Sequence, residues 1–223
     1  MKSSLLLKIY IIFTTLYLII LYLDLDGFDW YMKPILLPIL ITAVAVSESF
    51  PTKKILLIAL IFSWIGDIIL LFADKGELYF IFGLVAFLLS HLVYILLFSK
   101  QQNTRINEKK EIFWLGILAI LAYFFIMIDT LFLKLGDLKI PVIVYAVVIT
   151  TMLFFAFKGS LKWATPANNY ILVGAIVFVS SDSILAFNKF YAPITDASFY
   201  IMLTYCLAQY SIVSGILKLN TKT

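Results

Sequence analysis

Two carboxylates, Asp67 and Asp182, lie inside stretches of this chain that are otherwise apolar enough to cross a lipid bilayer. A charged side chain at that depth costs about 2.5–3.5 kcal/mol on insertion scales, so an intramembrane acid is first interpreted as a functional group. Both acids lie in similar short sequences, FSWIGDIILLF ending at Phe72 and FVSSDSILAF ending at Phe187, in which the aspartates align. We therefore expect the two acids to share a function.

Paired carboxylates are suited to acid catalysis. Two of them close together cannot easily ionise at the same time, so one retains its proton near neutral pH while the other stays an anion. Such a pair supplies a general acid and a negative charge that stabilises a developing cation, as in glycosidases. The only histidine, His91, lies in the apolar segment that follows Asp67. Adjacent antiparallel helices would bring the two into contact, and we predict a functional role for His91.

The composition predicts an all-α membrane protein. With 63% hydrophobic and 13% charged residues and a mean hydropathy of +1.05, the chain lies outside the range of soluble domains, which are about a quarter charged. Its apolar runs are too long and too continuous for barrel strands. We predict a single transmembrane domain over residues 1–223, with eight spans at about 5–23, 33–46, 55–73, 78–98, 112–129, 140–157, 169–187 and 198–217. The second span is the shortest, because Pro34 and Pro38 interrupt its start.

The repeat around the two acids indicates two halves of four spans each. Lys33-Pro34 opens the second span, and Lys139-Ile140-Pro141 opens the sixth at a similar offset. Four is an even number of crossings, so the halves would be parallel, and the acids would face each other across a central intramembrane cavity. The other interpretation is that each acid satisfies a separate packing contact, with a hydroxyl of Ser63, Ser180, Ser181 or Ser183.

The charge distribution and the cysteine content limit the topology, the partners and the cofactors that the protein can have. Lys and Arg number twelve on the side of both termini and five on the other, so both termini are predicted to face the cytoplasm. The net charge of +4 is then explained by the cations on the cytoplasmic side, and it gives little support to a nucleic-acid partner. The single Cys206 excludes an intramolecular disulfide. No nucleotide, metal or haem motif is evident, so we expect no cofactor and no metal. The Lys-, Ile- and Phe-rich composition is typical of a bacterial plasma-membrane protein.

Most of the predicted spans contain a short, distinctive sequence motif. These motifs are Lys33-Pro34, Gly66-Asp67, Phe82-Gly83 with Phe87, His91 and Tyr94, Pro141 with Tyr145, Ser181-Asp182-Ser183 with Ala186, and Tyr205 with Gln209. The order and spacing of these motifs, and their setting in eight predicted spans, make the chain resemble the YhhN-type lysoplasmalogenase family over nearly its whole length. The resemblance implies an eight-span hydrolase that cleaves the vinyl ether bond of lysoplasmalogen, or of a related ether lysolipid, to a fatty aldehyde and a glycerophospho-base. Its partner would be a membrane lipid.

The residues suit that reaction. Vinyl ether hydrolysis begins with a proton placed on the β carbon, which leaves an oxocarbenium ion that water captures. Asp67 and Asp182 would divide the acid and anion roles, in an order that the sequence leaves open. His91 would orient one of them or accept the proton of the attacking water. Candidates to bind the water or the lipid are Lys33, Tyr94, Tyr145, Ser181, Asn188, Tyr205 and Gln209. Tyrosines and lysines at such positions also serve as interfacial anchors.

Three other functions are alternatives. A proton-coupled transporter is the main alternative, because midplane acids, a histidine and paired halves suit it equally. It would move an unchanged solute into sealed vesicles, whereas a hydrolase releases aldehyde even in detergent. An intramembrane aspartyl protease needs GxGD where the chain has Trp64-Ile65-Gly66-Asp67, and it needs a Tyr-Asp motif that the chain lacks. A purely structural membrane protein would have no need of buried acids.

Overall fold

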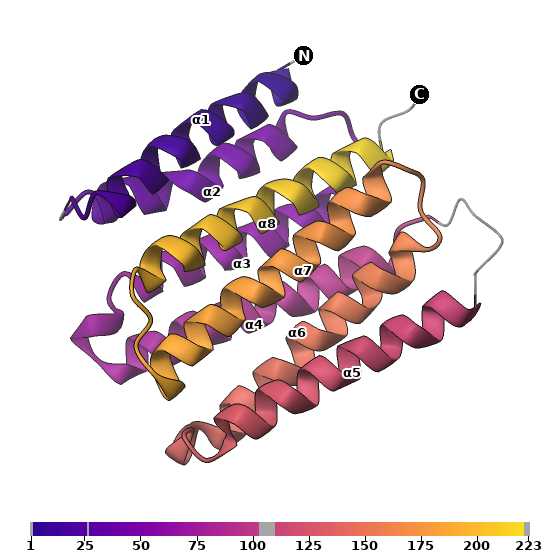
Figure 1. Cartoon of the computed structure of the whole chain (residues 1–223). Helices are drawn as coiled ribbons and strands as arrows, with labels where there is room; N and C mark the ends of the chain where they lie inside the picture. The colour runs from indigo at the N-terminus through magenta and orange to yellow at the C-terminus, as the bar shows by residue number, and fades with distance from the viewer. Residues whose placement is uncertain (1, 26, 103–109, 221–223) are drawn as a thin grey trace. The chain divides into compact units, whose positions relative to one another are not determined.

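The computed structural model describes residues 2–25, 27–102 and 110–220, and these ranges contain helices and no strand. Arg105, Lys109 and Lys222, which the charge count assigns to the cytoplasmic side, lie outside the described residues. A helix lies on each predicted span (Figure 1). The helices are α1 (Lys2–Tyr22), α2 (Asp29–Ala45), α3 (Lys53–Leu70), α4 (Glu77–Ser99), α5 (Lys110–Phe132), α6 (Lys139–Ser160), α7 (Ala167–Ala186) and α8 (Ala197–Asn220).

Length and composition make this an integral, multi-pass membrane protein. Within the described ranges six helices are long and apolar enough to cross a membrane, namely α1, α4, α5, α6, α7 and α8. The helices α2 and α3 are not among the six, because α2 has only 17 residues and α3 carries three charged residues, Lys53, Lys54 and Asp67. The count of eight spans stays a prediction.

The chain forms two compact units that divide between Leu97 and Phe98. The first contains α1, α2, α3 and almost all of α4, and the second contains α5, α6, α7 and α8. The division falls where the predicted halves would meet, and the symmetry between those halves stays a prediction. In each unit the third helix carries the acid close to its C-terminal end, at Asp67 in α3 and at Asp182 in α7.

Polar contacts fasten the helices of the first unit. The Tyr17 hydroxyl on α1 donates to Oδ1 of Asp29 at the start of α2, at 2.5 Å. The hydroxyls of Ser63 on α3 and Ser90 on α4 lie 2.7 Å apart, and Ser90 Oγ also donates to the carbonyl of Ala59 at 2.9 Å. Hydroxyls that bond across helices stabilise bundles in lipid, where water cannot compete. The predicted adjacency of the helices that carry Asp67 and His91 is therefore confirmed.

Two prolines lie inside α2, which begins at Asp29, before the predicted start at Lys33. Proline has no N–H, so Pro38 leaves the carbonyl of Pro34, four residues earlier, without its helical donor. The indole N–H of Trp64 on α3 donates to that carbonyl oxygen at 2.8 Å. An unpaired backbone group in hydrocarbon costs several kcal/mol, so the Trp64 bond allows α2 to continue past Pro38.

Replacing Trp64 with Phe should destabilise the first unit by about 1–3 kcal/mol, because the carbonyl of Pro34 loses its donor. The same substitution should cost much less in a Pro38→Ala background, where alanine at position 38 supplies the helical N–H. Thermal unfolding in detergent, followed by circular dichroism for wild type, both single variants and the double variant, measures this coupling. Equal costs of the Trp64 substitution in the two backgrounds would contradict the compensation.

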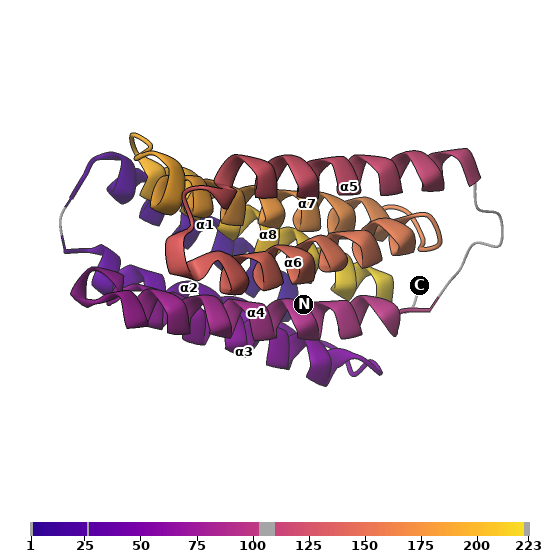
Figure 2. The same ribbon diagram turned by 90° about the horizontal axis from the view of Figure 1, so that it is seen from below.

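In the second unit α6 contacts both α5 and α7 (Figures 1 and 2). A short 3-10 turn, η2 (Gly136–Leu138), precedes α6, and a π-helical turn, η3 (Phe187–Tyr191), extends α7. At this end of the unit Leu131, Leu135 and Val142 form a buried apolar cluster. The cluster covers the end of α7 that follows Asp182, because Ala186 and Phe187 pack against it.

Candidate functional site

Three consecutive residues of α7 connect it to three different helices. The Ser181 hydroxyl donates to a backbone carbonyl of α8 at 2.9 Å. Oδ2 of Asp182 accepts from the Tyr145 hydroxyl on α6 at 2.5 Å, and Ser183 Oγ lies 2.5 Å from the Tyr123 hydroxyl on α5. With 3.6 residues per turn, successive side chains point about 100° apart, so a run of three polar residues reaches three neighbours. The fold thereby fixes the direction in which Asp182 points.

The serine and tyrosine bond of this group has a defined direction. Ser183 Oγ also donates to the carbonyl of Val179 on its own helix, at 2.5 Å. Because a hydroxyl carries one hydrogen, the Tyr123 hydroxyl is the donor in its bond to Ser183. Tyr145 of α6 and Tyr123 of α5 therefore both donate to α7, the first to Asp182 and the second to Ser183.

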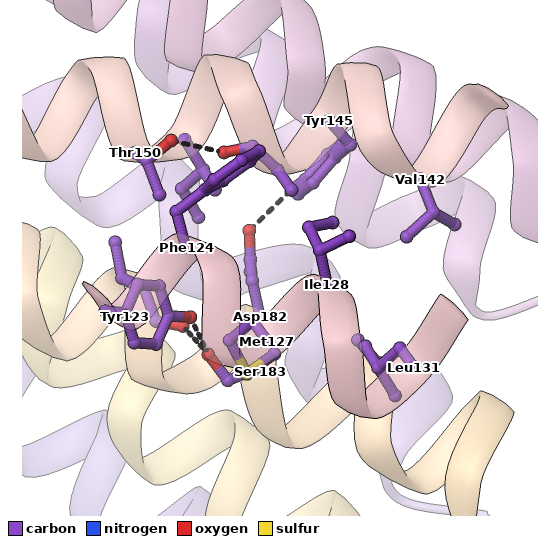
Figure 3. A pocket seen from close by; sticks show the side chains of 14 residues that line it. Tyr123, Phe124, Met127, Ile128, Leu131, Val142, Tyr145, Thr150, Asp182 and Ser183 are labelled. Carbon is purple, nitrogen blue, oxygen red and sulfur yellow. Dashed lines mark hydrogen bonds between the residues drawn. The ribbon is translucent and has the colours of Figure 1, made fainter. Parts of the chain in front are cut away.

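Asp182 and Tyr145 line a cavity of about 50 Å³ between α5, α6 and α7 (Figure 3). The side chains of Asp182 and Tyr145 point toward each other there, and most of the remaining wall is apolar, with Ile128, Leu131 and Val142 among its residues. A cavity of this kind needs about 10–15 Å³ to hold one water, so this one has room for a water or for the reacting end of a ligand. Electrostatic interactions are stronger in such apolar surroundings than in water.

Glycines set the rotation and register of α7. A Cβ atom on Gly174 would lie 2.9 Å from the backbone nitrogen of Ile212 and 3.0 Å from the carbonyl oxygen of Ala208, both on α8. Nearer the start of α7, a Cβ on Gly215 of α8 would lie 3.0 Å from the backbone nitrogen of Ile171. Small residues allow helix backbones to approach this closely, and close backbones resist rotation.

The other sequence-predicted residues of the second unit lie away from this cavity. Ser181 faces α8, and Tyr205 on α8 packs edge-to-face on Phe178, with ring centroids 5.6 Å apart. Asn188 Oδ1 accepts from the backbone N–H of Ile194 at 2.8 Å, which holds the loop after η3. Gln209 is fully buried on α8. Their roles in substrate binding stay predictions.

In the first unit Asp67 is buried on α3, and His91 and Tyr94 are buried on α4. A Cβ on Gly66 would lie 2.7 Å from the ring of Phe87, so α3 and α4 pack closely at that level. Ser90, the residue before His91, bonds Ser63, which lies about one helical turn before Asp67 on α3. Lys33, on α2, is half-buried.

Two polar cavity residues escaped the sequence reasoning, Tyr123 and Thr150. Tyr123 carries the only hydroxyl in the predicted span 112–129, and that isolation among apolar residues was a usable signal. Thr150 gave no comparable signal in the sequence, because a threonine inside a helix often bonds its own backbone. Its Oγ1 does so here and donates to the carbonyl of Ala146 at 2.6 Å.

Comparison with known proteins supports the resemblance. The profile of the YhhN family matches residues 28–216. The chain belongs to the YhhN family. A curated relative, lysoplasmalogenase TMEM86B of Sus scrofa, is 31% identical over 153 residues, 68% of this chain and 58% of the relative. TMEM86B of Homo sapiens is 29% identical over 198 residues, 88% and 72% of the two chains. Lysoplasmalogenase TMEM86A of Bos taurus is 29% identical over 165 residues, 71% and 63%.

The match of this YhhN-family chain spans about 58 to 72% of the length of those relatives. No solved structure matches it.

Replacing Gly174 with Ala should destabilise the second unit by about 1–3 kcal/mol, because the added methyl would overlap backbone atoms of α8. Gly116→Ala is the matched control. The nearest atoms to its methyl belong to the ring of Phe157, a side chain that can rotate away. Thermal unfolding by circular dichroism should show a larger loss for the Gly174 variant. Equal losses would mean that backbone proximity does not fix α7.

Proposed function

We propose that this protein is an intramembrane hydrolase that cleaves the vinyl ether bond of lysoplasmalogen or of a related ether lysolipid. One observation carries the proposal: a carboxyl group, Asp182, is oriented by the Tyr145 phenol inside a small, mostly apolar cavity. Its setting supports the assignment, because the protein belongs to the YhhN family and its curated relatives are named lysoplasmalogenases.

The first step is proton transfer to carbon. The ether oxygen enriches the β carbon of the double bond in electrons, and a carboxylic acid delivers its proton there while the π pair forms the new C–H bond. The remaining oxocarbenium ion is stabilised by a nearby carboxylate. Tyr145 donates to Oδ2 of Asp182 and so fixes the orientation of this carboxyl group. In either role, as acid or as anion, Asp182 needs this fixed orientation.

The second step consumes one water molecule. Water adds to the carbon of the oxocarbenium ion, and its extra proton passes to the carboxylate or to His91. The resulting hemiacetal loses its hydroxyl proton, its bond to the glycerol oxygen breaks, and that oxygen takes up a proton. The products are a fatty aldehyde and a glycerophospho-base, and the chemistry requires no cofactor. The cavity beside Asp182 is large enough for the water.

The remaining parts of the proposal concern the first unit and the membrane. Asp67 takes the acid or anion role that Asp182 does not, and His91 orients a carboxyl group or accepts the proton of water. Eight spans, arranged as two parallel halves around an intramembrane cavity, would bring these groups to one depth. Both termini would face the cytoplasm of a bacterial cell.

The function is tested by incubating the purified protein in detergent with alkenyl lysophospholipids, followed by mass spectrometry. We expect aldehyde and glycerophospho-base in equal amounts. A proton-coupled transporter would instead carry an unchanged solute into sealed proteoliposomes. Absence of aldehyde from both the pure lipids and a total lipid extract would contradict the proposal.

Asp182→Asn and Asp67→Asn should each lower kcat by about 10²–10⁴-fold, the usual contribution of general acid–base catalysis, with the fold intact. Glu48→Gln is the control, because it removes an exposed acid of the same chain, just before α3 begins and at the opposite end of that helix from Asp67. Aldehyde release and circular dichroism are measured on the same preparations. Wild-type turnover in either variant would remove that carboxylate from the mechanism.

Tyr145→Phe should lower kcat by about tenfold with little change in KM, because the phenol orients Asp182 and does not hold the lipid. Tyr123→Phe removes a phenol from the same cavity wall that bonds Ser183 instead, and it should cost less. The kcat and KM of both variants decide the question. Equal losses of kcat would indicate general damage to the cavity and not a specific effect on the carboxyl group.

A further inference from the structure

A second hollow in this unit lies between α5 and α6 and has a volume of about 290 Å³. Its walls are side chains of α5 from Ile117 to Phe124 and of α6 from Val147 to Phe154. It is open along its side, since Leu121 is 48% and Val147 is 47% exposed. In a membrane such an opening faces lipid, so a ligand could enter it sideways.

This groove adjoins the Asp182 cavity. Phe124 and Thr150 line both, and Figure 3 shows these two side chains on the wall of the cavity. The groove extends from the cavity toward the N-terminal half of α5 and the C-terminal half of α6. A long ligand could therefore lie in the groove with one end at the carboxyl group.

The walls of the groove suit hydrocarbon. Its two hydroxyl side chains donate to their own helix, Thr150 to the carbonyl of Ala146 at 2.6 Å and Thr151 to that of Val147 at 2.7 Å. The other lining side chains are aliphatic or aromatic. A polar ligand would lose its hydrogen bonds to water and gain few here, at a cost that an apolar chain does not incur.

We propose that the groove binds the hydrocarbon chain of the lipid substrate and thereby places the ether bond at Asp182, an inference that rests on the proposed function. The groove, at about 290 Å³, is many times the ~10–15 Å³ that a cavity needs to hold one water, so it has room for a run of methylene groups. The head group then points to the opposite end of the cavity, toward η2 and the start of α6. Under the predicted topology that end faces the outer surface, as the head group of an outer-leaflet lipid does.

A pair of matched substitutions tests the groove. Val147 and Val144 lie on the same helix, and each is 47% exposed, but Val147 lines the groove and Val144 does not. Val147→Phe should lower kcat/KM by about tenfold or more for alkenyl lysolipids whose chains fill the groove, and leave the shortest chains unaffected. Val144→Phe should match wild type at every chain length. Identical profiles for the two variants, or an equal loss at all lengths for Val147→Phe, would overturn the proposal.

A binding measurement separates the groove from the reaction. An alkyl lysophospholipid with a photoreactive group at the end of its chain cannot be cleaved as a vinyl ether, and it should label α5 between 117 and 121 or α6 between 151 and 154. Competition by alkenyl lysolipid is expected, whereas competition by diacyl phospholipid alone would assign the groove to bulk bilayer lipid and refute the proposal. If wild type releases no aldehyde, the proposed function fails, and the labelled position still decides whether the groove binds a lysolipid chain.

Discussion

In hydrocarbon a polar group has no water to bond, and the protein itself must supply its partner. The hydrogen bond from Tyr145 to Asp182 follows from this constraint at the candidate site. The bond from Trp64 to the carbonyl of Pro34 follows from it in the first unit, where a proline has removed the usual donor. The same requirement thus fixes a catalytic candidate in one unit and a helix pair in the other.

Orientation of the acid links packing to chemistry. Because Gly174 lets α7 approach α8 closely, α7 cannot easily rotate, and Ser181, Asp182 and Ser183 each reach their own neighbouring helix. The carboxyl group consequently faces a small, mostly apolar cavity. The apolar groove beside it offers a place for a chain. A small reactive end and a long apolar body are what the proposed ether lysolipid would bring to them.

The sequence was sufficient to predict all eight helices, since long apolar runs have few alternatives in lipid. It also singled out Asp182, as an acid in an apolar segment, and the family motifs added Tyr145 as a binding candidate. It could not pair them, because their contact depends on the rotation of α6 against α7, which Gly174 and its neighbours on α8 help to set. Local rules likewise placed Pro34 and Pro38 at the start of a helix. The compensating donor, Trp64, comes from another helix and is invisible to such rules.

Transfer of a proton from a carboxyl group to carbon is the step on which the proposed chemistry rests, and single-turnover cleavage in H₂O and in D₂O tests it most directly. With enzyme in excess over an alkenyl lysolipid, we expect slower cleavage in D₂O and a deuterium on the carbon next to the aldehyde. Equal single-turnover rates in the two solvents would contradict proton transfer to carbon as the step that the carboxyl groups catalyse.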